Sequence, residues 1–187
     1  VEIIFLICGG MPLFDALTTS FGTAGTGGFG IKNASLAEYS PYIQYVVTVF
    51  MILFGVNFNV YYLILIKRFR DAGNYEELKY YLLTIVAATA LITYNVRNLF
   101  PTLEEAFRHA SFQVASIITT TGFSTNNFDL WPYFSKTILV VLMFIGACAG
   151  STGGGIKVSR IVLLLKTIKK ELVFYCHPRS VRKIKWN

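Results

Sequence analysis

Two stretches of this chain share a Thr-x-Gly-Phe pattern followed by a small residue. They are the first glycine loop, residues 26–30 (Thr-Gly-Gly-Phe-Gly), and the second glycine loop, residues 120–124 (Thr-Thr-Gly-Phe-Ser). Glycine permits dihedral angles that turn several successive carbonyl groups toward one axis. Such carbonyls replace the hydration shell of a cation without adding fixed charge. The residues predicted to line an ion path in this way are Thr26, Gly27, Gly28, Phe29, Thr120, Thr121, Gly122 and Phe123.

The side chains of these loops have separate predicted roles. Each threonine hydroxyl adds one more oxygen, whereas Phe29 and Phe123 are expected to pack outward and hold the loops in place. A single glycine-rich loop in a membrane protein is equally well explained as a tight turn or a packing surface of small residues. Two copies with the same flanking pattern favour the ion-binding interpretation.

The two loops belong to a longer internal repeat with an offset of 94 residues, as from Gly28 to Gly122. The matching pairs are Ala16/Ala110, Thr26/Thr120, Gly28/Gly122, Phe29/Phe123, Leu36/Leu130, Tyr39/Tyr133, Val46/Val140, Val47/Val141 and Phe50/Phe144. Apolar, glycine-rich sequences can resemble themselves by chance. Because polar and aromatic positions match here in one register without a gap, we interpret the similarity as a true repeat.

The composition is that of a membrane protein. Hydrophobic residues make up 54% of the 187 residues, charged residues only 14%, and the mean hydropathy is +0.54, whereas soluble domains have about 25% charged residues. The net charge of +7 does not indicate nucleic-acid binding, because the basic residues cluster beside apolar segments. Cys8, Cys148 and Cys176 are scattered and suit neither a disulfide framework nor a zinc site. The sequence shows no nucleophile paired with a general base that would suggest an enzyme.

The first half of the chain predicts one loop between two apolar segments. Residues 1–9 resemble the end of a spanning helix, and because the chain begins inside this apolar run we expect it to be a piece of a longer protein. Pro12 suits the first turn of a short helix to about Gly22. The apolar segment 41–66 is long enough to cross a bilayer core of about 30 Å.

The second half repeats this order. A polar connector, residues 71–79, precedes a candidate span over residues 80–96. Thr102 and Glu105 have capping-box spacing, which predicts a helix to about residue 118 that is too short and polar to span. The apolar segment 131–165 then contains a glycine-rich break, residues 146–155, and basic residues follow to Lys185.

The basic residues predict an orientation. If the short helix before each glycine loop dips into the membrane and returns, 13 of the 17 lysine and arginine residues lie on one side. That group contains Lys67, Arg68, Arg70, Lys79, Lys157, Arg160, Lys166, Lys169, Lys170, Arg179, Arg182, Lys183 and Lys185. The positive-inside rule places this side in the cytoplasm and both glycine loops on the outer side.

With these motifs in view, the chain resembles the Trk/Ktr/HKT superfamily of potassium transporters, and most closely its TrkH and TrkG type membrane subunits. The most specific segments are residues 112–116 (Phe-Gln-Val-Ala-Ser), 119–124 (Thr-Thr-Thr-Gly-Phe-Ser), 130–132 (Leu-Trp-Pro) and 143–157, which includes Gly-Ser-Thr-Gly-Gly-Gly-Ile-Lys. These are similar to the third of four membrane-pore-membrane repeats in that family. Residues 26–29 and 54–58 (Phe-Gly-Val-Asn-Phe) resemble the second.

The resemblance implies an all-α membrane protein built from units of a membrane helix, a re-entrant pore helix with its filter loop, and a second membrane helix. Residues 1–70 would form the second repeat, 71–79 a cytoplasmic connector, 80–170 the third repeat and 171–187 a basic cytoplasmic tail. The first and fourth repeats lie outside this chain. Potassium would be the transported ion, held by filter carbonyls only, with no bound cofactor.

The resemblance also gives the glycine-rich break a role as a gate inside the membrane. The residues assigned to this gate are Gly146, Gly150, Ser151, Thr152, Gly153, Gly154, Gly155 and Lys157. A continuous helix is disfavoured there, because each glycine costs about 1 kcal/mol relative to alanine. Without the resemblance, a helix kink with small-residue packing would be the preferred interpretation.

Partners and location follow from the same resemblance. It implies a multi-pass protein of the bacterial inner membrane, a homodimer, contacts with membrane lipids and a cytoplasmic nucleotide-binding regulatory subunit of the TrkA or RCK type. The basic segments 67–79 and 166–185 are the candidate contacts for that subunit or for lipid headgroups. Because half of the repeats are absent, a non-conducting assembly or regulatory fragment of a cation transporter is the alternative function.

Overall fold

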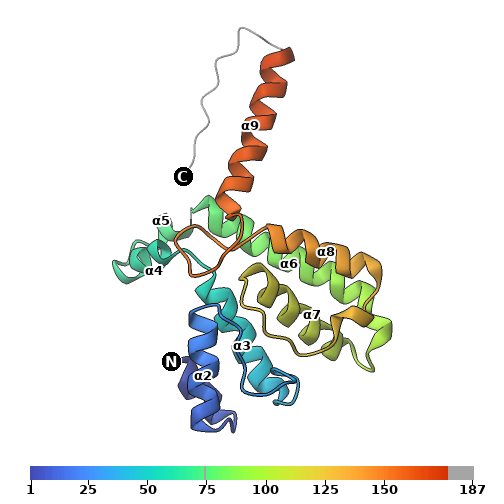
Figure 1. Ribbon diagram of the computed structural model, residues 1–187. Helices are drawn as coiled ribbons and strands as arrows, with labels where there is room; N and C mark the ends of the chain where they lie inside the picture. Colours follow the sequence, from blue (N-terminus) through green and yellow to red (C-terminus); the bar gives the residue numbers. More distant parts are fainter. Residues whose placement is uncertain (74, 177–187) are drawn as a thin grey trace.

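The computed structural model describes residues 1–73 and 75–176, and their structure is dominated by helices (Figure 1). The elements in chain order are α1 (Glu2–Cys8), α2 (Leu13–Ala24), α3 (Pro41–Phe54), α4 (Phe58–Leu65), α5 (Phe69–Gly73), α6 (Glu76–Val96), a 3-10 turn (Arg97–Leu99), α7 (Leu103–Ile118), a second 3-10 turn (Phe128–Leu130), α8 (Tyr133–Phe144) and α9 (Val158–Cys176). The predicted all-helical fold is therefore confirmed. The end of the basic tail, residues 177–187, lies outside the described part.

The helix starts follow local sequence signals. Ser40 caps α3, where its Oγ accepts a hydrogen bond from Ile43 N at 3.5 Å, and Pro41 occupies the first turn. Thr102 caps α7 in the same manner, since its Oγ1 accepts from Glu105 N at 3.2 Å. The short helix predicted after Pro12 and the helix predicted from Thr102 to about residue 118 are both confirmed.

The apolar segment 41–66, predicted to be long enough to cross a bilayer, is not one continuous helix. The chain breaks between α3 and α4, and the two helices meet at an angle of 90°. The last carbonyls of α3 are satisfied from outside the helix: Tyr81 Oη donates to Ile52 O at 3.1 Å and Tyr61 Oη donates to Leu53 O at 2.6 Å. Because these hydroxyls replace the helical donors, α3 ends without leaving buried carbonyls unpaired.

The new helix after this break also has a local cause. Asn57 Oδ1 accepts from Asn59 N at 2.9 Å and so caps the start of α4. The preceding Gly55 lies against Tyr81, because a Cβ atom at position 55 would be 2.2 Å from Tyr81 Oη. The glycine and the asparagine together allow the sharp turn.

One described helix is long and apolar enough to cross a membrane. It runs from Glu76 to Leu99 and begins before the predicted start at Tyr80. The bent pair of α3 and α4 meets the same criterion only when its two helices are taken together. The predicted interruption of residues 131–165 is confirmed, because α8 ends at Phe144 and α9 begins at Val158.

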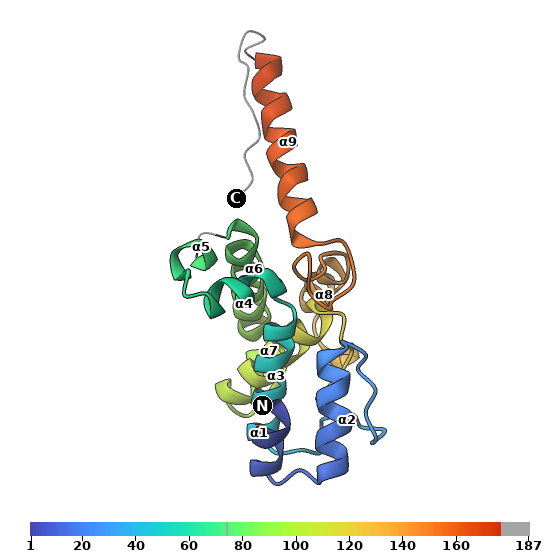
Figure 2. The ribbon, with the colours of Figure 1, turned by 90° about the vertical axis from the view of Figure 1, so that its left-hand side faces the viewer.

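Two hydrophobic clusters hold the helices together. The larger one joins α6, α7 and α8 through fully buried side chains such as Tyr81, Ile92 and Leu139. The smaller one joins α1, α2 and α3, and it also contains Phe112 and Phe123 from the second repeat. The two halves therefore share a core, while α9 projects away from the body in both views (Figures 1 and 2).

Candidate functional site

The two glycine loops have the same backbone conformation. Each follows the end of a short helix, α2 at Ala24 and α7 at Ile118. Thr26 and Thr120 have φ angles of 50° and 58°, a left-handed conformation that is uncommon for threonine. Gly28 and Gly122 follow with φ angles of 64° and 90°. The repeat seen in the sequence is thus also a repeat of backbone geometry.

The hydrogen bonds that shape the loops recur with the same offset. Thr26 N donates to Thr23 O at 3.2 Å, and Thr120 N donates to Ile117 O at 3.0 Å. In the following position, Gly27 N donates to Gly22 O at 2.8 Å and Thr121 N to Ser116 O at 2.9 Å. These bonds close the helix ends and hold the chain as it enters each loop.

The two glycine loops lie side by side. A Cβ atom on Gly28 would be 1.9 Å from the carbonyl oxygen of Thr121, so only glycine fits between the two backbones. Beyond the loops, Leu36 N donates to Ser124 O at 3.0 Å, and Ser124 N donates to Ser35 Oγ at 3.2 Å. Backbone segments from the two repeats therefore support each other directly.

The two phenylalanines of the loops have different surroundings. Phe123 is 1% exposed and packs in the smaller hydrophobic cluster, close to Gly22 of the first repeat. Its carbonyl accepts from Ser116 Oγ at 2.5 Å. Phe29 is 85% exposed over the described residues. The predicted anchoring role thus suits Phe123, whereas Phe29 is not buried in either hydrophobic cluster of the described residues.

The segment that follows the first glycine loop, residues 31–40, is also fixed in place. Tyr39 Oη donates to Asp15 Oδ2 at 2.6 Å and ties residues 31–40 to α2. Burial, together with this hydrogen bond to a carboxylate, raises the pKa of Tyr39 to about 12. The phenol therefore remains a hydrogen-bond donor throughout the neutral pH range.

The glycine-rich break folds back as a loop with a narrow neck. Ile145 and Ile156 form a parallel β-bridge, with Gly146 N donating to Ile156 O at 2.8 Å and Ile156 N donating to Phe144 O at 3.2 Å. A Cβ atom on Gly146 would lie 2.0 Å from Gly154 O, so the neck closes only around glycine. The ten residues from 146 to 155 are held between the two helices as a separate loop.

This break contacts both glycine loops through their threonines. Gly154 N donates to Thr120 Oγ1 at 2.7 Å. Thr26 Oγ1 lies 3.0 Å from Thr152 O and 2.8 Å from Gly25 O, so its hydroxyl hydrogen can donate to either carbonyl. The two left-handed threonines therefore point their hydroxyls at the glycine-rich break, and the structure brings all three predicted segments together.

The opposite side of the break is fixed to the bend between α3 and α4. Cys148 N donates to Gly55 O at 3.1 Å, and Phe58 N donates to Gly150 O at 3.1 Å. The bend, which the sequence did not predict, thus supplies the acceptor Gly55 O, and the first residue of α4 supplies the donor Phe58 N. At the C-terminal end of the glycine-rich break, Lys157 Nζ donates a hydrogen bond to Gly153 O.

Glu77 is a site residue that sequence reasoning missed. It was assigned to a polar connector, but it lies in the first turn of α6, is 2% exposed, and its Oε1 accepts from Ala149 N at 2.6 Å and Ser159 N at 3.2 Å. The available signal was an acidic residue at the start of an apolar helix, which usually indicates a solvated helix end. Its actual partners are far away in the sequence.

A second missed feature is a buried polar network between α3 and α7. Arg108 Nη1 donates to Gln44 Oε1 at 2.9 Å, and Arg108 also forms an ion pair with Glu104 at 3.2 Å. Gln44 Nε2 donates in turn to Leu36 O at 3.0 Å. The network links the two repeats near the glycine loops, and its signal in the sequence was a glutamine within an apolar segment.

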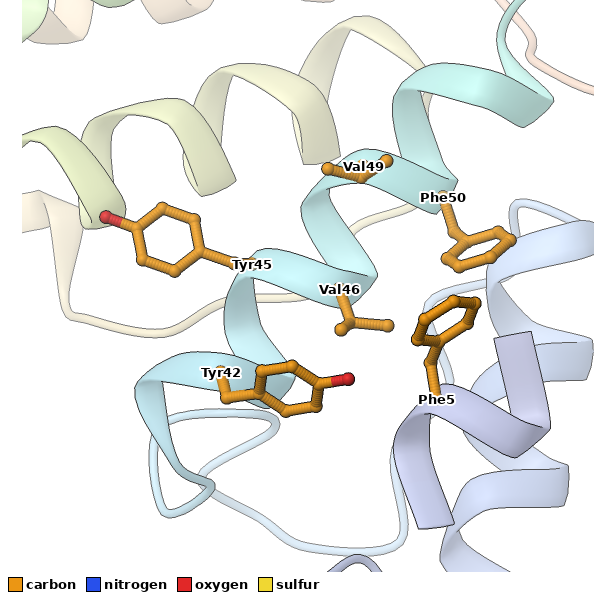
Figure 3. Close-up of a pocket in the computed structure, with 6 residues that line it drawn as sticks. All are labelled: Phe5, Tyr42, Tyr45, Val46, Val49 and Phe50. Atoms are coloured by element: carbon orange, nitrogen blue, oxygen red, sulfur yellow. The ribbon is translucent and has the colours of Figure 1, made fainter. Parts of the chain in front are cut away.

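An apolar pocket lies beside this network (Figure 3), because Tyr45, which lines it, donates from its Oη to Glu104 Oε1 at 2.9 Å. It has a volume of about 320 Å³ and is formed by side chains of α1 and α3. Its lining residues are Phe5, Tyr42, Tyr45, Val46, Val49 and Phe50. Over residues 1–73 and 75–176, no group of three or more histidine, cysteine, aspartate or glutamate side chains is placed to hold a metal ion.

The fold and the paired loops define a class of helical cation transport proteins. A family model described as "TrkH: Cation transport protein" matches residues 7–186, so the chain belongs to the TrkH family. The resemblance inferred from the motifs is confirmed, and the family is one of transporters rather than enzymes.

Individual relatives are similar over nearly the whole chain. The potassium uptake protein TrkH of Salmonella typhimurium is 37% identical over 182 residues, and TrkG of Escherichia coli is 31% identical over 179 residues. These alignments cover 94% and 92% of this chain, but only 37% and 36% of the relatives. The crystal structure of the potassium transporter TrkH from Vibrio parahaemolyticus matches with a TM-score of 0.91 and 34% identity, over 99% of this chain and 41% of that one.

Proposed function

We propose that this chain forms two adjacent quadrants of a potassium uptake pore, with the two glycine loops as its share of the selectivity filter. The observation that carries the proposal is the matching left-handed threonine and glycine backbone at residues 26–28 and 120–122. Residues 26–29 and 120–123 contribute carbonyl oxygens to a dehydrated potassium ion. The remaining oxygens come from the first and fourth repeats of the full-length protein.

In this proposal, α2 and α7 are re-entrant pore helices. α2 lies between α1 and α3, α7 lies between α6 and α8, and each of the two ends where its glycine loop begins. The carbonyl end of a helix carries a partial negative charge of about half an elementary charge. Two such ends directed at the ion path favour cations over anions.

The glycine-rich break acts as the gate. Its backbone contacts Thr26 and Thr120. It therefore lies against the start of each glycine loop, next to the end of the pore helix. An irregular backbone at membrane depth is tolerated where it lines a water-filled cavity. An ion leaving the filter on this side meets the loop, which must move for conduction.

The orientation and partners are part of the same proposal. The glycine loops face the outside of a bacterial inner membrane, and the basic residues near residues 67–79 and along α9 face the cytoplasm. There the basic surface contacts lipid headgroups and a nucleotide-binding regulatory subunit of the TrkA or RCK type. The full-length protein forms a homodimer, and the domain limits are those given by the sequence.

Ion flux through the full-length protein in liposomes tests the filter assignment. We expect Gly122→Ser to reduce the preference for potassium over sodium, because a side chain at φ 90° strains the backbone that presents the carbonyls. Gly10→Ser is a matched control, since Gly10 has a φ of 85° and, like Gly122, open space around a Cβ atom. Unchanged selectivity in Gly122→Ser would show that the loop is not a filter.

A further inference from the structure

Glu77 connects the glycine-rich break to α9, the helix that follows it. Its Oε1 accepts one hydrogen bond from Ala149 N, inside the break, at 2.6 Å. The same oxygen accepts another from Ser159 N, in the first turn of α9, at 3.2 Å. Glu77 itself belongs to the first turn of α6. One carboxylate therefore joins three elements.

The burial of this carboxylate makes both contacts important. Glu77 is 2% exposed, and a buried charged group is costly unless hydrogen bonds satisfy it. Hydrogen bonds from backbone N–H groups to a carboxylate are stronger than those between neutral groups. Separating Ala149 or Ser159 from Glu77 thus leaves a buried charge with fewer donors, which resists independent movement of the break and of α9.

Glu76, the residue before Glu77, makes a second contact with α9. Glu76 forms a salt bridge with Lys166, about two helical turns beyond Ser159. Beyond its first turns α9 projects from the body (Figures 1 and 2). Its orientation relative to the rest of the described chain is therefore fixed largely at α6, through contacts at Ser159 and Lys166.

We infer that Glu77 is a positioning residue that holds the glycine-rich break closed and couples it to α9. A displacement of α9 that pulls Ser159 away loosens the shared carboxylate and with it the bond to Ala149. The loop then moves away from Thr26 and Thr120. This inference rests on the proposed function only in taking residues 146–155 as the gate.

Thiol labelling of Cys148, with rates compared as a function of pH so that a change in thiolate fraction is separated from a change in exposure, reports loop position without measuring transport. Cys148 is 1% exposed and adjoins Ala149. The background is the full-length protein in which every other cysteine, including Cys8 and Cys176, is replaced by serine. In this background we expect Cys148 of the Glu77→Ala variant to react with a maleimide about tenfold faster than in the parent, because two charge-assisted hydrogen bonds are lost. Glu77→Gln keeps an acceptor oxygen and should give an intermediate rate.

Glu76→Ala is the matched control on the same helical turn. It removes the second contact that holds α9 but leaves both hydrogen bonds of Glu77 in place, so its labelling rate should rise by less than that of Glu77→Ala. Potassium flux in liposomes should rise in Glu77→Ala. A residue that only stabilises the fold would instead lower flux, and faster labelling with lower flux therefore overturns the inference.

The remaining outcomes are also decisive. Labelling and flux at the parent rate in Glu77→Ala overturn the inference. If Glu77→Ala does not yield a monodisperse protein, Glu77→Gln decides: faster labelling supports the inference, and the parent rate overturns it. If the parent protein conducts no potassium but Glu77→Ala still exposes Cys148, the proposed function fails, while the positioning role of Glu77 stands.

Discussion

Gly28 and Gly122 occupy equivalent positions in the repeat but meet different surroundings. Both have positive φ angles, so any other L-residue costs about 1–2 kcal/mol in backbone strain at either position. At Gly28 a Cβ atom would also lie 1.9 Å from Thr121 O, whereas at Gly122 it would meet open space. The pseudo-symmetry of the backbone is therefore not a symmetry of packing.

This difference predicts unequal effects of the same substitution. Gly28→Ala should destabilise the full-length protein by about 3 kcal/mol or more, because strain adds to the displacement of the neighbouring loop. Gly122→Ala should cost only the strain. Thermal unfolding of the two variants in detergent measures the comparison. Equal shifts in the unfolding midpoint would mean that the two loops are not in contact as described.

At the scale of elements, the sequence predicted what local signals encode. The capping box at Thr102 predicted the start of α7, and glycine spacing revealed the repeat and the break at residues 146–155. The bend between α3 and α4 was not predicted, because Gly55 and Asn57 only permit a turn, whereas the partner that pairs with Ile52 O is the distant hydroxyl of Tyr81.

The assembly of the candidate site has the same limit. Sequence reasoning named the glycine loops and the break separately, and the contacts between them became visible only in the structure. Glu77 meets partners that are 72 and 82 residues away, and nothing local distinguishes it from a solvated helix-capping carboxylate. The hydrogen bond between Arg108 and Gln44, which are 64 residues apart, could not be predicted for the same reason.

The glycine-rich break can be tested as an element by removing it. Ile145 and Ile156 already form a bridge, and bridged chains lie about 4.8 Å apart, close to the 3.8 Å spanned by one peptide unit. Deleting residues 146–155 should therefore join α8 to α9 with a small adjustment. We expect higher potassium flux through the full-length protein in liposomes.

A double variant provides the control for this deletion. The deletion removes Ala149, so adding Glu77→Ala should change the flux no further if both act through the same loop. Additive effects would show that Glu77 acts elsewhere. Wild-type flux in the deletion variant would contradict a gating role for residues 146–155.

At the scale of the whole molecule, the described residues leave large apolar side chains uncovered. Large apolar side chains such as Leu83, Phe134 and Leu164 are 63%, 53% and 59% exposed. Lipid or further protein must cover such surfaces in a membrane protein. The chain spans only 37% of the length of its relative from Salmonella typhimurium, which agrees with a pore completed by additional repeats.

The proposed orientation of the whole molecule can be measured with two exposed positions. Asn33 follows the first glycine loop, and Arg70 belongs to the basic segment beyond α4; both are exposed. In a cysteine-free full-length background, Asn33→Cys should react with a membrane-impermeant maleimide in intact spheroplasts. Arg70→Cys should react only after the membrane is permeabilised, because the positive-inside rule places its cluster in the cytoplasm.

Cys8, exposed at the end of α1 and retained as the sole cysteine in a third variant, discriminates the re-entrant arrangement from simple spanning, because it should react from the same side as Asn33→Cys. A dip and return by α2 keeps Asn33 on the same side as the end of α1, and α3 with α4 then carries the chain to Arg70 on the opposite side. If α2 crossed the membrane fully, Asn33 would change sides relative to α1. Labelling of Asn33→Cys and Arg70→Cys from the same side would contradict the topology, and with it the placement of the two glycine loops at the outer end of the pore.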